Sequence, residues 1–510
     1  DRNIYQCWLY DNLRFDESRE VAEEIIGYSM GGGFEFDKAP ESFKWWLSQY
    51  SAQIGLGIEL GVKAREKSAN KSARGSVSPL ISTQWKQKEP YNNAIPTVTL
   101  GSARKCQTGC GATAVAQIMK YYECPSSVGQ GQKSYDIYYK NNSPSQGKYE
   151  YAFNPIDGYT SMTTFSADFG NTHYDWDNML NSYDGEYSAK EAEAVSTLMY
   201  HVGVAMEMLY SPSGSTSYVS TAVSALSKHF GYDKSARYVQ RDYYTDEAWE
   251  DMIYAELAAH RPVVYGGDSD DSGHMFVCDG YDAENNAYHI NWGWGGNCDG
   301  YYALTGSSAL NPDKNGTGNA AHYTGTQDAV VNLKPDEGGD YEYVINWKEA
   351  SVEKSEIKSG ENLLFGGKII NHSAVSVTME IGAKFIRKTD KQTYYVSIGK
   401  IKSLDPRKLK YAQNYAIATA SVPEGSYDVK LVFKKSTDDV WREANTKIVP
   451  QVDITSDQEP IPTGISQVVS EGDVHIEAIY TIDGKSVNSL QKGMNIVRMS
   501  NGRVEKIVVK

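Results

Sequence analysis

Cys110 has the sequence surroundings of a reactive side chain. Glycines stand on both sides of it, and the residues that follow place apolar side chains at the i, i+3, i+4 and i+7 spacing of one helix face: Val115, Ile118, Met119 and Tyr122. We therefore expect Cys110 at or just before a first helical turn, where unpaired N–H groups and the helix dipole favour a thiolate. A thiolate there is a nucleophile. Taken alone, the stretch also fits a cysteine packed as a small apolar residue.

Two further candidates lie far downstream, on what reads as a hairpin. Residues 273–281 begin with Gly-His and continue as a strand, residues 282–286 are a polar turn, and a second strand follows, ending at Asn291. Two strands joined by a short polar loop predict a hairpin. His274, at the start of one strand, and Asn291, at the end of the next, are then expected to be neighbours.

These motifs resemble those of a known family. The Thr-Gly-Cys-Xaa-Ala-Thr-Ala segment, the Gly-His strand and the Asn-Trp-Gly-Trp-Gly-Gly corner are similar to the streptopain family of bacterial cysteine proteases, which have a papain-like fold. The likeness covers roughly residues 25–335. It implies a secreted cysteine endopeptidase, made as a latent precursor, that acts on proteins and peptides.

Each catalytic requirement has a candidate residue. Cys110 is the expected nucleophile, and His274 is expected to pair with it as an imidazolium and then protonate the leaving nitrogen. Asn291 is expected to accept a hydrogen bond from the far ring nitrogen. The backbone N–H of Cys110 is an oxyanion donor. No glutamine stands six residues before Cys110, so the second donor is unassigned.

Other residues are expected to shape the site. Trp292 and Trp294 would cover the His–Asn pair and keep water from it. The resemblance implies that Ser215 and Gly273 touch the substrate backbone. His289 is a rival for the catalytic histidine, but it would point into the site only if the strand register differed.

Composition limits the other chemistry. The chain has 65 acidic and 50 basic residues and a net charge of −15, which argues against a nucleic acid or an anionic membrane as partner. No apolar run is long enough to span a bilayer, and no signal peptide is recognised at Asp1. The six cysteines match no common zinc pattern. We expect no cofactor or metal, although an Asp-rich loop before His274 leaves calcium as an alternative. Cys278 is expected as a packed thiol, with a bridge to Cys298 as the alternative.

The length predicts several domains, of α+β class overall. Residues 1–75 resemble the inhibitory propeptide of the family, which holds the catalytic histidine away from the cysteine, and a Lys/Arg/Ser-rich linker from Lys63 to Gly75 is the expected cleavage region. Residues 76–335 would form the papain-like peptidase domain. Residues 336–452 show short alternating strands that indicate an immunoglobulin-like β-sandwich.

Residues 453–510 end in a pattern that resembles the C-terminal sorting domain of type IX secretion substrates, again all-β. This resemblance implies the secretion machinery as a partner and a secreted or surface-attached, monomeric protein. Two other functions stay open. The chain could be a non-catalytic surface adhesin on a protease scaffold, or a Cys-His acyltransferase that passes acyl groups to amines. Decay usually loses one catalytic residue, whereas Cys110, His274 and Asn291 are all present.

Overall fold

The computed structural model describes residues 74–143, 148–155, 157–269, 272–306, 309–312, 323–437, 439–455, 476–481, 484–499 and 504–509. The chain divides into two compact units, residues 1–455 and 456–510, and each is treated by itself. The predicted propeptide therefore lies outside the described residues, except for Arg74 and Gly75. Among the described helices, none is long and apolar enough to cross a membrane.

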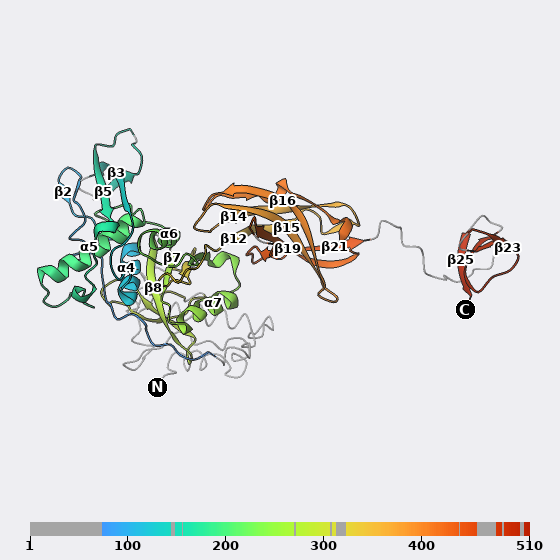
Figure 1. The fold of residues 1–510 in the computed structure, drawn as a ribbon, viewed down its shortest axis with the longest axis horizontal. Helices are drawn as coiled ribbons and strands as arrows, with labels where there is room; N and C mark the ends of the chain where they lie inside the picture. The colour runs from blue at the N-terminus through green and yellow to red at the C-terminus, as the bar shows by residue number, and fades with distance from the viewer. Residues whose placement is uncertain are drawn as a thin grey trace, which may run out of the picture. The chain divides into compact units, whose positions relative to one another are not determined.

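A six-stranded antiparallel sheet forms the centre of the first part of the chain (Figure 1). Its strand order is β10-β9-β8-β7-β11-β6. The strands are β6 (Arg237–Gln240), β7 (Val263–Asp268), β8 (Gly273–Asp282), β9 (Ala287–Asn291), β10 (Gly300–Tyr302) and β11 (Asp328–Val331). Strands β8 and β9 are the predicted hairpin, in the register Val277 opposite Asn291. The prediction of a hairpin that carries His274 and Asn291 is confirmed.

Helices cover both faces of this sheet. Met275 and Val277 of β8 pack into the core that contains α4 (Cys110–Tyr122), whereas Phe276 and Cys278 pack into the core that contains Trp249 of α7 (Asp246–Ala258). Successive side chains of a strand point to opposite faces, which explains this division. Figure 1 shows α4 and α7 on opposite sides of β8. The α4 face also carries α5 (Ala189–Ala205) and α6 (Val219–His229).

Several of these elements were expected from the sequence. Helical patterns in the sequence at 191–208 and 246–260 predict two helices, which correspond to α5 and α7, and the run Val263-Val264-Tyr265 predicts a buried strand, which is part of β7. A three-stranded sheet, β4-β3-β5, was not predicted. It consists of β3 (Gln132–Ser143), β4 (Lys148–Ala152) and β5 (Ser161–Asp168), and the small pair β1 (Val98–Thr99) and β2 (Ala103–Arg104) lies before them in the chain.

The rest of the first unit is all-β, as predicted. One sheet has the order β12-β14-β17 with β18 beside β14, and the other has the order β13-β21-β19-β15-β16 with β20 beside β19. A core of their inward-facing apolar residues lies between them. The strands are β12 (Ile345–Val352), β13 (Glu356–Lys358), β14 (Asn362–Asn371), β15 (Val377–Arg387), β16 (Thr393–Leu404), β17 (Leu409–Tyr411), β18 (Ala416–Ala418), β19 (Gly425–Lys435), β20 (Arg442–Glu443) and β21 (Gln451–Thr455). The immunoglobulin-like type stays a prediction.

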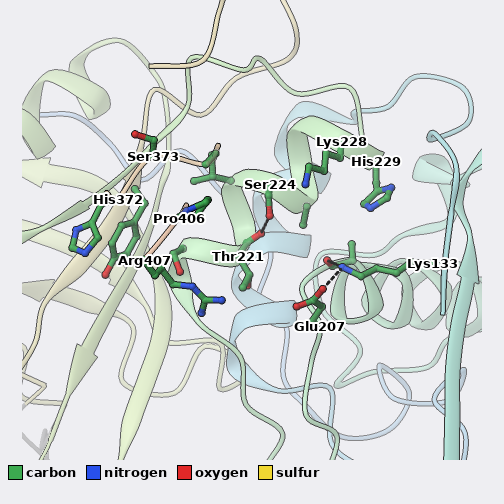
Figure 2. Close-up of a pocket in the computed structure, with 16 residues that line it drawn as sticks. Lys133, Glu207, Thr221, Ser224, Lys228, His229, His372, Ser373, Pro406 and Arg407 are labelled. Carbon is green, nitrogen blue, oxygen red and sulfur yellow. Dashed lines mark hydrogen bonds and ion pairs between the residues drawn. The ribbon is translucent and has the colours of Figure 1, made fainter. Parts of the chain in front are cut away.

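A cavity of about 210 Å³ lies where the part with the six-stranded sheet meets this all-β part (Figure 2). The part with the six-stranded sheet contributes Lys228 and the ion pair of Lys133 with Glu207, 3.0 Å apart, and the all-β part contributes Arg407 and His372. Among the described residues, Lys228 and Arg407 have no carboxylate partner. The cavity is therefore positively charged, in contrast to the chain as a whole.

The second unit contains one four-stranded antiparallel sheet of order β23-β22-β24-β25. Its strands are β22 (Ile476–Thr481), β23 (Ser486–Val487), β24 (Gly493–Met499) and β25 (Val504–Val509). This agrees with the all-β prediction for the end of the chain. The sorting role and the three boundaries between the four predicted domains stay predictions.

An extended segment, residues 76–87, crosses the back of the β8–β9 hairpin, and Asp279 holds it there. The Asp279 carboxylate is fully buried, accepts the Ile81 N–H at 2.9 Å and lies 2.7 Å from Nδ1 of His289. Removing such a buried acceptor leaves two donors without a partner.

We predict that Asp279→Ala lowers the free energy of unfolding by about 3 kcal/mol, because it leaves buried polar groups unpaired. Denaturant unfolding followed by tryptophan fluorescence measures this. Glu193→Ala, at an exposed helix position, is the control and should change the midpoint little. Equal effects of the two substitutions would contradict the prediction.

Candidate active site

Cys110 is the first residue of helix α4, as the sequence predicted. The preceding residue, Gly109, has φ +85°, a conformation that side chains with a Cβ rarely adopt. A Cβ at Gly109 would also lie 2.7 Å from Sδ of Met208 and 2.9 Å from the carbonyl oxygen of Ser215. Only glycine therefore lets the chain enter the helix at this angle, and the angle sets where the sulfur points.

The surroundings of the Cys110 sulfur combine two opposing effects. Burial raises its pKa, while the backbone N–H groups of Met275, Gly111 and Cys110 itself donate to the sulfur and lower it. The net pKa is raised above the usual thiol value. The prediction of a low-pKa thiolate is therefore wrong for this state of the protein, because the helix-end donors do not offset the loss of water.

His274 lies at the start of β8, buried between aromatic rings. Its ring centroid is 4.8 Å from that of Trp294 and 6.0 Å from that of Trp292, both in stacked orientation. The ring of Tyr323 lies 5.5 Å away. Burial lowers the pKa of His274 to about 4, although the carbonyl of Trp292 partly opposes this. The two tryptophans cover the histidine, as expected.

The hydrogen bond that orients the imidazole differs from the one predicted. Nε2 of His274 donates to the backbone carbonyl of Trp292 at 2.8 Å, and not to the side chain of Asn291. The Asn291 amide is buried and has other partners: its oxygen accepts from Gln117 Nε2 at 3.1 Å and from the Gly293 N–H at 3.0 Å. The predicted contact of Asn291 with the ring is therefore absent between these two described residues.

The strand register explains the difference. Asn291 lies directly opposite Val277, so both side chains point to the α4 face of the sheet. His274 is three positions from Val277 along β8, and its ring lies with Phe276 on the other face. The imidazole therefore bonds to the main-chain carbonyl of Trp292, just beyond β9, while the Asn291 side chain points to the opposite, α4-facing side of the sheet.

Cys110 and His274 are close in the fold but are not bonded to each other. The sulfur accepts from the N–H of Met275, the residue next to His274, and Tyr323 interacts electrostatically with Cys110 and contacts the imidazole. Among the described residues, no hydrogen bond joins the sulfur to the ring. With a raised thiol pKa and a lowered imidazole pKa, both groups are uncharged at neutral pH.

The two residues expected to touch the substrate lie near the sulfur or the histidine. Ser215 is buried, and its hydroxyl donates to the Gln107 carbonyl at 2.7 Å and accepts the Ser211 N–H at 3.0 Å. Its hydroxyl therefore fixes a loop beside Gly109. Gly273 is exposed and precedes His274, and a Cβ there would lie 2.7 Å from Oδ1 of Asp268. The contacts of both with substrate stay predictions.

The remaining alternatives are resolved by other contacts. His289 pairs with Asp279 and not with Cys110. Cys278 is a free, buried thiol on the face of Phe276, as predicted, and Cys298 is also free. Among the described residues, no group of three or more His, Cys, Asp or Glu side chains could hold a metal ion. Asp270 and Asp271 of the Asp-rich loop lie outside those residues.

The sequence reasoning missed Gln117 and Thr83, which are buried and bonded to each other and to Asn291. One signal was available. Gln117 is two helical turns after Cys110, so it lies on the same side of the helix, and a polar residue inside an otherwise apolar stretch needs a buried partner.

Comparisons with known proteins agree with the motifs. The Peptidase C10 family matches residues 85–302. Streptopain of Streptococcus pyogenes is 34% identical over 323 residues, which are 61% of this chain and 75% of that protein. The thiol protease/hemagglutinin PrtT of Porphyromonas gingivalis is 32% identical over 326 residues, 61% of this chain and 34% of that protein.

Two solved structures are also similar in sequence. Active wild-type interpain A of Prevotella intermedia is 38% identical and covers 52% of this chain and 98% of its own, with a TM-score of 0.43. A fragment of prointerpain A from the same organism is 35% identical and covers 60% of this chain and 86% of its own, with a TM-score of 0.42.

We predict that the protein loses stability as the pH falls from 6.5 towards 4. Burial lowers the folded-state pKa of His274 to about 4, so between these values the unfolded chain binds a proton that the folded chain does not. Thermal unfolding across this range, in a Cys110→Ala background that limits self-digestion, should show the decline. The decline should be smaller in the additional presence of His274→Gln, and an equal decline in both would contradict the assignment.

Proposed function

The chain belongs to the peptidase C10 family and is a cysteine-type peptidase, and from this premise we propose that Cys110 and His274 hydrolyse peptide bonds in proteins. The observation that carries the proposal is the contact between the ends of two distant segments. The N–H of Met275, next to His274, is directed at the sulfur of Cys110 at the head of α4. This contact supports the proposal that Cys110 is the nucleophile and His274 the base.

The reaction would proceed in two steps. His274 takes the thiol proton, and the sulfur attacks the carbonyl carbon of the scissile bond. The imidazolium then gives its proton to the departing amine nitrogen, which leaves an acyl-enzyme. A water molecule, deprotonated by His274, hydrolyses the thioester and restores the thiol. The N–H of Cys110, at the positive end of α4, would donate to the oxyanion.

The supporting residues have distinct proposed roles. Trp292 would fix the imidazole through its carbonyl, and Trp294 would shield the ring from water. Asn291 would act indirectly: it accepts the Gly293 N–H and so holds the peptide that follows Trp292. Ser215 and Gly273 would flank the substrate backbone on the two sides of the sulfur. The fold of residues 76–335 would be papain-like.

The uncharged state of the thiol and imidazole supports a latent precursor. A thiolate–imidazolium pair stabilises both charges, and the described state lacks the hydrogen bond that such a pair needs. We propose that residues before Arg74 act as the inhibitory propeptide and that their removal lets the pair form. We further propose export of the protein through its C-terminal all-β unit, and a β-sandwich of immunoglobulin-like type between residues 336 and 452.

Arg74 and Gly75 bear on where the precursor is cut. The Arg74 side chain is only 8% exposed, pairs with Asp251, and lies over the rings of Tyr254 and Tyr281. The hydroxyl of Tyr254 accepts the Gly75 N–H at 2.9 Å and lies 3.2 Å from the Gly75 carbonyl oxygen. A peptidase must seat extended chain on both sides of the bond that it cuts, so these contacts protect the Arg74–Gly75 bond.

We predict that Cys110→Ala abolishes cleavage of casein by the processed protein, because the sulfur is the atom that forms the acyl-enzyme. Peptide mapping after labelling with iodoacetamide should find the activity-linked adduct on Cys110. Cys124→Ala, another partly exposed free thiol, is the control and should retain activity. Persistent cleavage by Cys110→Ala would reject the proposal.

The same assay separates the alternatives. Formation of isopeptide bonds between a glutamine peptide and a labelled amine, faster than hydrolysis, would identify an acyltransferase. A thiol that reacts with no substrate-like probe, even after removal of the N-terminal segment, would favour an adhesin.

We predict that maturation leaves Arg74 on the catalytic chain. The new N-terminus should fall between residues 64 and 74, because Arg74 and Gly75 are anchored to α7 and the β8–β9 hairpin. Mass spectrometry of the processed protein locates it. Arg74→Ala should lower the melting temperature of the processed form and admit cuts after residue 74. A native mature form that begins at Gly75 or later would contradict the anchor.

A further inference from the structure

Gln117 is a fully buried polar residue in the middle of α4. It lies seven residues after Cys110, which is two turns, or about 10 Å, along the same side of the helix. The residues around it in α4 are buried, and those on both sides of it, Ala116 and Ile118, are apolar. A buried polar amide destabilises the fold unless it is hydrogen-bonded. The partners of Gln117 therefore indicate what the residue does.

Three side chains from three segments form a closed cycle of hydrogen bonds. Thr83 donates its hydroxyl proton to Oε1 of Gln117 at 3.0 Å, and Gln117 Nε2 donates to Oδ1 of Asn291 at 3.1 Å. Asn291 Nδ2 then donates to the backbone carbonyl of Thr83 at 2.8 Å. The cycle joins the extended segment 76–87, helix α4, which carries Cys110, and the end of strand β9.

Two backbone groups fix the direction of this cycle. The N–H of Trp85 donates to Oε1 of Gln117 at 3.2 Å, and the N–H of Gly293 donates to Oδ1 of Asn291 at 3.0 Å. A backbone N–H can only donate, so each amide must present its oxygen there and its nitrogen to the other partner. The cycle therefore has one arrangement, and it sets the separation between α4 and the corner after β9.

The corner is the element that orients the catalytic histidine. The Trp292 peptide is held on one side by its own N–H, which donates to Asp299 Oδ1 at 2.9 Å. On the other side the Gly293 N–H is bonded to Asn291. Between these two bonds, the Trp292 carbonyl accepts the Nε2 proton of His274 at 2.8 Å.

We propose that Gln117 is a positioning residue for the peptidase reaction: it sets the Trp292 carbonyl, and through it the His274 imidazole, relative to the sulfur on its own helix. This inference rests on the proposed roles of Cys110 and His274. Gln117 touches neither the sulfur nor the imidazole. It acts through Asn291, which accepts hydrogen bonds from Gln117 and from the Gly293 N–H. Asn291 thus has an indirect role in place of the predicted direct contact with the ring.

The test compares two Gln→Met substitutions, one at Gln117 and one at a control position, each in the processed protein with its C-terminal domains retained. Gln117→Met keeps the volume of the side chain and removes both of its hydrogen-bonding groups. Gln327→Met is the matched control: Gln327 is also buried, beside strand β11 of the same sheet, but its oxygen accepts from Tyr265 on the face opposite α4. Melting temperature, kcat and KM for a peptide substrate, and the rate of thiol alkylation against pH are measured for each.

Gln117→Met should lower kcat about 10- to 100-fold with little change in KM, because a small displacement of a catalytic group slows the chemical step more than binding. Alkylation of Cys110 should also begin at a higher pH than in the unmodified protein, since a displaced imidazole stabilises the thiolate less. Gln327→Met should lower the melting temperature by a similar amount and leave kcat and the alkylation profile unchanged.

The inference is overturned if Gln117→Met loses stability like the control while kcat and the alkylation profile stay those of the unmodified protein, because Gln117 is then a packing residue only. If Gln117→Met fails to fold, Thr83→Val replaces it, because this substitution removes one hydrogen bond of the same cycle. It should lower kcat by a smaller factor and again leave KM nearly unchanged. An unchanged kcat in a folded Thr83→Val would also count against it.

A double-mutant cycle identifies the route. If Gln117 acts through Asn291, the kcat losses of Gln117→Met and Asn291→Ala should not add in the double variant. Additive losses would show that Gln117 acts by another path and would overturn this part of the proposal. Failure of the proposed function is distinguishable, since it appears as retained activity in Cys110→Ala, whatever Gln117→Met does.

Discussion

The hydrogen bond from His274 Nε2 to the Trp292 carbonyl is the interaction on which the site depends. An imidazole must present one defined nitrogen to a thiol, and its other nitrogen decides the tautomer. A backbone carbonyl can only accept a hydrogen bond, so it fixes the tautomer with the proton on Nε2 and leaves Nδ1 free of that proton for the proposed reaction. The position of the imidazole therefore depends on how firmly the Trp292 carbonyl, just after β9, is held. The chain after β9 is held by buried amides, and rigid packing of the neighbouring indoles restricts the ring further.

Burial keeps both the thiol and the imidazole of this site uncharged at neutral pH. The donors at the head of α4 lower the pKa of the Cys110 thiol, but burial raises it by more. Burial also lowers the pKa of His274. Each group could keep its charge only if the other charge lay beside it. A charged thiolate–imidazolium pair therefore requires direct contact between the two groups.

Local patterns predicted much of this molecule. The head of α4, the β8–β9 hairpin and the aromatic cover of His274 follow from helix periodicity, strand alternation and a short polar turn. The role of Asn291 could not be predicted in the same way. It depends on the register of one strand pair, which decides the face to which a side chain points, and a hairpin pattern leaves that register open. The pKa of Cys110 likewise depends on its burial in the folded chain and on the backbone N–H of Met275, which is distant in sequence from the cysteine.

The segment from Arg74 to Gln87 connects the processing of the chain to its chemistry. Its first residue is anchored beside α7, Val77 pairs with Tyr281 at the far end of the hairpin, and Ile81 is held by Asp279. Thr83 and Trp85 then bond to Gln117, and the carbonyl of Gln87 accepts the Thr108 N–H just before the nucleophile. The segment thus contacts Gln117, whose amide is bonded to Asn291, and also the residue two positions before Cys110. The proposed removal of an N-terminal part that ends before Arg74 would leave all of these bonds in place.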